Sequence, residues 1–127
     1  MEIGIIGLGL IGGSLAKAIS QNTDNTVYGY DISDQVVKKA VLVNAIEQPL
    51  TDSLLPQCDI VIVALYPKAA IEYVQAHADL IKPGAIVVDC CGVKKIVCDA
   101  LIPLAEEKGF LFVGGHPMAG LEHSGFT

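Results

Sequence analysis

The chain opens on Met1-Glu-Ile-Gly-Ile-Ile-Gly-Leu-Gly-Leu-Ile-Gly-Gly-Ser14, a short apolar run that leads into the pattern Gly7-x-Gly9-x-x-Gly12. A helical pattern of apolar residues follows, and Asp31 lies nineteen positions after Gly12. Strand, glycine loop, helix and distant acid in this order are typical of a dinucleotide site. Gly7 permits a tight turn, Gly9 lets the backbone approach a pyrophosphate, and Gly12 lets the helix pack closely on the strand. The stretch therefore predicts a dinucleotide-binding domain, with the partial positive charge of the helix N-terminus aimed at the ligand.

Strands and helices are expected to alternate along the rest of the chain. The central run Asp59–Leu65 is apolar and rich in β-branched residues, which is typical of a strand buried on both faces. The pattern predicts strands at Ile3–Ile6, Thr26–Tyr30, Asp59–Leu65, Ala85–Asp89 and Phe110–Val113, and offers Ala45–Ile46 as the start of a short third strand. It predicts helices at Ile11–Ser20, from Ser33 or Asp34 to Val43, at Lys68–Leu80 and at Val93–Glu107, the last bent or ended by Pro103. These elements indicate an α/β fold, a doubly wound parallel sheet of about six strands (a Rossmann domain) over residues 1–127.

Composition narrows the function classes. The net charge is −6 and all eight basic residues are lysine, which argues against a nucleic-acid partner and leaves no arginine to bind a phosphate. No apolar run approaches the ~20 residues that cross a bilayer, and Glu2 replaces the basic start of a signal peptide. We therefore expect a cytoplasmic protein without a membrane partner.

The four cysteines lack the C-x-x-C spacing of metal and redox sites. We expect reduced thiols that fill small apolar sites, and we expect no metal. The residues concerned are Cys58, Cys90, Cys91 and Cys98.

Asp31 favours NAD over NADP. At the end of a strand its carboxylate can accept hydrogen bonds from the adenosine-ribose hydroxyls, whereas a 2′-phosphate would be repelled with no arginine to compensate. Ile32 would then line the edge of the adenine, and Leu8, Leu10 and Ile11 would contact the cofactor from the glycine loop. The alternative is that Asp31 only caps a helix or shapes a turn.

Two later loops emerge at the same edge of the predicted sheet, where ligands of open α/β sheets lie. They are Leu65-Tyr66-Pro67 after the fourth strand and Cys90-Cys91-Gly92 after the fifth. Their backbone groups are candidates for contact with the nicotinamide half of the cofactor, and plain loop geometry is the alternative.

His116 is the candidate catalytic residue. It follows the sixth strand between Gly114-Gly115 and Pro117, and imidazole titrates near neutral pH, which suits a group that takes a proton from a hydroxyl as hydride leaves. A structural histidine is the alternative.

The segment Gly114-Gly-His-Pro-Met-Ala-Gly-Leu-Glu-His-Ser-Gly125 resembles the prephenate dehydrogenase family. The opening glycine loop and Tyr30-Asp31-Ile32 are similar to that family as well, so the resemblance spans essentially the whole chain. It implies NAD-dependent oxidative decarboxylation of prephenate, or dehydrogenation of arogenate, in tyrosine biosynthesis. The family's histidine falls on His116 and its glutamate on Glu122, at the mouth of the site.

The same resemblance implies a helical domain after residue 127 that binds the substrate and forms a homodimer. The family's lysine falls on Lys94, which is either structural or anion-facing. Gly92 stands where the family commonly has a serine that orients the histidine, and Leu121 stands where many members have threonine or serine. Two alternatives stay open: another dehydrogenase of the β-hydroxyacid type, and a standalone NAD-binding or NAD-sensing module.

Overall fold

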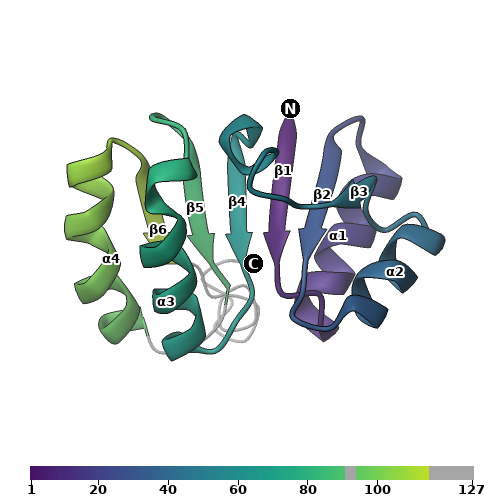
Figure 1. Cartoon of the computed structure of the whole chain (residues 1–127), viewed down its shortest axis with the longest axis horizontal. Helices are drawn as coiled ribbons and strands as arrows, with labels where there is room; N and C mark the ends of the chain where they lie inside the picture. Colours follow the sequence, from purple (N-terminus) through teal and green to yellow (C-terminus); the bar gives the residue numbers. More distant parts are fainter. Residues whose placement is uncertain (91–93, 115–127) are drawn as a thin grey trace, which may run out of the picture.

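The computed structural model describes residues 1–90 and 94–114, which form one six-stranded sheet with helices on both sides (Figure 1). All strand pairs are parallel, and the strand order is β3-β2-β1-β4-β5-β6. The strands are β1 Glu2–Ile6, β2 Thr26–Tyr30, β3 Gln48–Pro49, β4 Ile60–Val63, β5 Ile86–Asp89 and β6 Leu111–Gly114. The helices are α1 Leu10–Asn22, α2 Asp34–Leu42, α3 Pro67–His77 and α4 Lys94–Lys108, with short 3-10 turns η1 Leu55–Gln57 and η2 Ala78–Leu80. The predicted six-stranded doubly wound sheet is confirmed.

Successive residues of β1 point into two separate cores, as the period of a strand requires. Ile5 belongs to the core that also contains residues of α1 and α2, and Ile6 to the core that contains residues of α3 and α4. Both side chains are fully buried. Figure 1 shows α1 and α2 beside β1 to β3, and α3 and α4 beside β4 to β6. The strand order reverses between β1 and β4, and in such sheets a ligand crevice opens at this point.

The third strand lies later in the chain than the sequence predicted. Ala45 and Ile46 do not form it, because their N–H groups donate to the carbonyl of Ala40 (2.8 and 3.3 Å) and close the end of α2. Their apolar side chains are buried in the core instead. The strand pairing with β2 covers Gln48 and Pro49, and a proline is tolerated there because β3 is an edge strand.

The last helix runs through Pro103, which the sequence predicted would bend or end it. Helix α4 is continuous from Lys94 to Lys108. Pro103 is exposed, and the opposite side of the helix buries Val97, Leu101 and Ala105 in the core. The backbone hydrogen bond that a proline removes is outweighed here by this burial.

Candidate functional site

The glycine loop between β1 and α1 borders a cleft of about 550 Å³ at the carboxyl ends of the strands. The cleft lies where the strand order reverses, and its volume falls within the range of small-molecule sites. Its lining residues come from the glycine loop and the first turn of α1, from the end of β2, and from the loop after β4 together with the start of α3. They are Gly7, Gly9, Leu10, Ile11, Gly12, Asp31, Ala64, Leu65, Tyr66 and Ala69.

The three glycines of the loop meet different surroundings. Gly7 has φ +93°, and a Cβ built on it would lie 2.5 Å from the carbonyl oxygen of Ala64. A Cβ on Gly12 would lie 1.7 Å from the carbonyl oxygen of Gly7. A Cβ on Gly9 would meet nothing within 4 Å. The fold itself therefore requires Gly7 and Gly12, whereas Gly9 leaves open space into which a ligand can approach the backbone.

Helix α1 presents its N-terminus to this cleft. Gly9 is the N-cap and supplies no side-chain cap, and the first turn carries no acidic residue. The first helical bond runs from the N–H of Gly13 to the carbonyl of Gly9 (2.8 Å). The N–H groups of Leu10, Ile11 and Gly12 come before that bond, so helix geometry gives them no partner within α1. Together with the helix dipole they form a site suited to a phosphate group.

Asp31 follows β2 and is half-buried at the border of the cleft. Its Oδ2 accepts the N–H of Leu8 (2.8 Å) and its Oδ1 accepts the N–H of Ser33 (2.9 Å). An ionised carboxylate has about four acceptor positions, so each oxygen keeps room for one more donor. Asp31 can therefore bind hydroxyl groups of a ligand and shape the turn before α2 at the same time.

The predicted cofactor-binding residues divide between the cleft and its surroundings. Leu8 is not among the lining residues, because its side chain is 6% exposed in the core and its N–H bonds to Asp31. Ile32 and Pro67 also lie outside the lining. Ile32 is 92% exposed, and Pro67 begins α3. All the other predicted cofactor-binding residues that the structure describes line the cleft. Among them, the side chain of Tyr66 is 85% exposed.

Ala64 and Ala69 line the cleft and were not predicted. A Cβ on Gly12 would lie 3.3 Å from the Cβ of Ala64, so a larger residue at position 64 would crowd the glycine loop. The sequence signal for Ala64 was a small residue at the end of a run of β-branched residues. Ala69 carries no comparable signal.

The predicted residues Cys91, Gly92, His116 and Glu122 lie outside the described residues, as does the side chain of Lys94. The strands that precede them are described. Asp89 at the end of β5 pairs with Gly114 at the end of β6, and Val63 of β4 pairs with Asp89. The chain therefore leaves β5 and β6 at the same edge of the sheet as the cleft.

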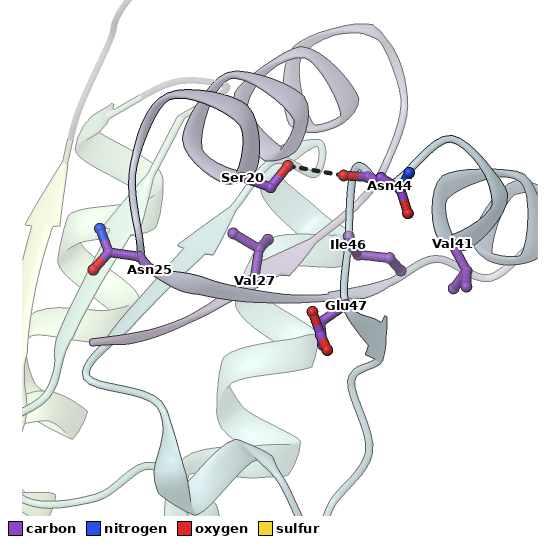
Figure 2. A pocket seen from close by; sticks show the side chains of 7 residues that line it. All are labelled: Ser20, Asn25, Val27, Val41, Asn44, Ile46 and Glu47. Carbon is purple, nitrogen blue, oxygen red and sulfur yellow. Dashed lines mark hydrogen bonds between the residues drawn. The ribbon is translucent and has the colours of Figure 1, made fainter.

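A second hollow of about 320 Å³ opens at the other end of the sheet (Figure 2). The side chains that line it include polar groups already engaged within the protein: the Ser20 hydroxyl donates to the carbonyl of Asn44 (3.0 Å), and Oδ1 of Asn25 accepts from the N-terminal ammonium (3.0 Å). Beneath them lie the buried side chains of Val27 and Ile46. This hollow offers a ligand neither a glycine loop nor a helix N-terminus.

Among residues 1–90 and 94–114, no three histidine, cysteine or acidic side chains are grouped so that they could hold a metal ion. None of the helices found there has the length and apolar character needed to cross a membrane.

Known proteins place this geometry in context. Residues 15–127 match the family model of the prephenate dehydrogenase nucleotide-binding domain. The chain is 33% identical to a prephenate dehydrogenase of Bacillus subtilis (strain 168), in an alignment that covers 95% of this chain and 33% of that protein. The chain therefore spans about a third of the length of this curated relative.

Two solved structures have the same fold as the chain and are also similar to it in sequence. The arogenate dehydrogenase of Synechocystis superposes with a TM-score of 0.83 and 28% identity, over 92% of this chain and 41% of that one. The prephenate dehydrogenase of A. aeolicus was solved with hydroxyphenyl propionate and NAD+. It superposes with a TM-score of 0.78 and 31% identity, over 94% of this chain and 42% of that one. The cleft described above thus belongs to a fold that both structures share.

Proposed function

The chain belongs to the prephenate dehydrogenase family as its nucleotide-binding domain, and we propose that it supplies the NAD site of an enzyme that converts prephenate to 4-hydroxyphenylpyruvate in tyrosine biosynthesis. The observation that carries this proposal is the cleft that Gly9 leaves open beside the N-terminus of α1, with Asp31 at its border. Arogenate is the second candidate substrate, because a solved arogenate dehydrogenase is among the similar structures.

The residues of the cleft fit NAD. The N–H groups at the start of α1 would bind the pyrophosphate, and Gly9 would let it approach. Asp31 would accept the adenosine-ribose hydroxyls and repel a 2′-phosphate, which no arginine of this sequence could neutralise. When bound, NAD accepts a hydride from the substrate. Ile32 would border the adenine, and the loops of residues 65–67 and 91–92 would border the nicotinamide half.

His116 is the proposed proton acceptor. It follows β6 by two residues in the sequence, and β6 ends at the edge of the sheet that holds the cleft. The imidazole would take the proton of the ring hydroxyl as hydride leaves the ring carbon that carries this hydroxyl. The bond between the ring and its carboxylate then breaks, and carbon dioxide departs. The electron pair of the broken bond stays with the ring and completes its aromatic system. The imidazolium can return the proton to the resulting phenolate oxygen.

Two further side chains have proposed roles near the substrate. Glu122 would form part of a charge network at the mouth of the site, and Lys94 would face an anion. Gly92 offers no side chain to orient His116, so we assign that task to Cys91, a water molecule or the backbone.

The substrate-binding site should be completed by a second domain. Prephenate carries two carboxylates, and such groups are usually held by arginine or clustered cations. This chain has no arginine, so we propose that a helical domain after residue 127 supplies the cations and the homodimer contacts. We place the enzyme in the cytoplasm, where a buried free thiol such as Cys58 stays reduced.

The test follows the appearance of reduced cofactor when the full-length protein that contains this chain is mixed with NAD and either prephenate or arogenate. His116→Asn should lower turnover by roughly 10²–10⁴-fold while NAD affinity is retained. His123→Asn is the matched control and should keep normal turnover. Near-normal turnover of His116→Asn would assign the proton transfer to another group.

The isolated chain separates the alternatives. Residues 1–127 alone should bind NAD and should not turn over prephenate. If the full-length protein binds NAD but oxidises neither substrate, the proposed reaction is wrong, and a dehydrogenase of the β-hydroxyacid type or an NAD-binding or NAD-sensing module takes its place. If neither form binds NAD, the proposed function is wrong.

A further inference from the structure

Asp31 connects two backbone segments at the border of the cleft. Its Oδ2 accepts the N–H of Leu8, in the glycine loop, and its Oδ1 accepts the N–H of Ser33, in the turn before α2 (2.8 and 2.9 Å). Ser33 in turn caps α2 by accepting the N–H of Val36 on its hydroxyl (3.4 Å). We propose that the Asp31 carboxylate is a clamp that positions the glycine loop for a nucleotide, separately from any contact with the ribose. This inference rests on the proposed nucleotide site and deepens it.

The end of β2 contacts the start of the glycine loop at three neighbouring positions, residues 29, 30 and 31. The N–H of Gly7 donates to the carbonyl of Tyr30 (2.7 Å), and the N–H of Leu8 donates to Asp31. The side chain of Leu8 packs over Gly29, where an added Cβ would lie 3.0 Å from its Cδ1. Of these contacts, the one from Asp31 is made by a polar side chain. A substitution can therefore remove it without altering the backbone or the core.

The position of Leu8 determines where the binding surface lies. Gly9 comes directly after Leu8, and α1 begins at the following residue, Leu10. If the N–H of Leu8 loses its acceptor, it is left without its partner in a half-buried setting, and the loop shifts to reach another one. Such a shift moves the N–H groups at the start of α1 away from the position that suits a pyrophosphate.

A carboxylate is needed at position 31 because both partners are N–H donors. Asparagine has the same size but one acceptor oxygen, and its amide NH₂ would face one of the two backbone donors. Asp31→Asn therefore releases either Leu8 or Ser33. Asp34→Asn is the matched control, because Asp34 is exposed in the first turn of α2 and its replacement removes the same charge close to the same site.

The experiment compares ADP with 2′,3′-dideoxy-ADP, which has no ribose hydroxyls, by calorimetric titration of the full chain. If Asp31 acts as a clamp, Asp31→Asn should weaken dideoxy-ADP by about fivefold, the effect of one lost hydrogen bond, and ADP by about 20-fold. Asp34→Asn should bind both ligands as the original chain does. An unchanged affinity of Asp31→Asn for dideoxy-ADP would mean that Asp31 acts through the ribose alone, and the clamp would be wrong.

Hydrogen–deuterium exchange of the ligand-free protein gives a second, independent measurement. In Asp31→Asn, peptides that cover residues 7–10 or 32–36 should exchange faster, while peptides from β1 and β4 stay protected and show that the fold is intact. Unchanged exchange in both loops would overturn the clamp. If ADP binds to neither protein, the nucleotide site itself is wrong, and the exchange data still decide whether the clamp exists.

Discussion

The two ends of the sheet use their polar groups differently. At the amino end, polar groups of the protein bond to one another: the Tyr28 hydroxyl donates to the Glu2 carboxylate (2.7 Å), and the Asp59 carboxylate accepts from the backbone N–H of Glu2 (2.9 Å) and from the Lys82 ammonium (2.5 Å). The hydrogen bond from Lys82, followed by the one from Glu2, holds the pKa of the Asp59 carboxyl below its usual value.

At the carboxyl end, the glycine loop leaves the open face of Gly9 and the first N–H groups of α1 turned to the cleft. The polar groups at the amino end therefore support the fold, whereas those at the carboxyl end remain open to a ligand. Substitutions at the two ends should therefore separate stability from binding.

The largest expected effect comes from Gly12→Ala, because this glycine serves both the fold and the site. The added Cβ would lie 1.7 Å from the carbonyl oxygen of Gly7, so the backbone must move. We expect a loss of about 3 kcal/mol in the free energy of unfolding, measured in urea, together with loss of NAD binding. Gly13→Ala is the control: its Cβ would lie 3.2 Å from the carbonyl oxygen of Leu8, and stability should change by less than about 1 kcal/mol. Equal stability of the two variants would show that the close contact of helix and loop is unimportant.

Gly9→Ala should separate binding from folding. The φ of Gly9 is −72°, which suits any L-residue, and its Cβ would meet nothing within 4 Å. We expect the free energy of unfolding to stay within about 0.5 kcal/mol of the original value. The affinity for NAD, measured by calorimetry, should fall by about 100-fold because the methyl group occupies the space of the pyrophosphate. Unchanged affinity would place the cofactor elsewhere.

Tyr28→Phe should show the reverse pattern at the amino end, with a smaller effect. Losing the hydrogen bond to Glu2 should cost about 1 kcal/mol of stability and leave NAD affinity unchanged. The hydrogen bond to Glu2, with burial, raises the pKa of Tyr28 to about 12. The unfolded chain therefore loses this proton first, near pH 10, and stability should fall as the pH rises from about 10 toward 12. Thermal unfolding between pH 8 and pH 11 should show that the difference in melting temperature between the original protein and Tyr28→Phe becomes smaller as the pH rises. A difference that is constant with pH would rule out a contribution of the Tyr28 proton to stability.

The sequence was most informative where a pattern of residues is compatible with one backbone structure. The run Asp59–Leu65 and the glycine loop predicted the central strands, because continuous β-branched residues and closely spaced glycines fit few other structures. The third strand was misplaced because the burial of Ala45 and Ile46 looks the same in a sequence whether it serves a strand or a helix end. Pro103 does not end α4, because a proline signals a lost hydrogen bond but not the tertiary packing that offsets it.

The candidate site shows the same limit. Gly9, Asp31 and Tyr66 were predicted from motif and loop position, and all three line the cleft. The sequence could not show that Leu8 turns into the core or that its N–H bonds to Asp31, since both depend on how β2 lies against the glycine loop. The roles of His116, Glu122, Lys94, Cys91 and Gly92 stay predictions.

The most direct test of the account is a pair of calorimetric titrations of the chain with NAD and with NADP. Because the Asp31 carboxylate lies at the border of the cleft and the sequence contains no arginine, we predict that NAD binds at least about tenfold more tightly. Asp31→Ser combined with Ile32→Arg should narrow that difference. NADP binding as tight as that of NAD, or no binding of either, would contradict the account.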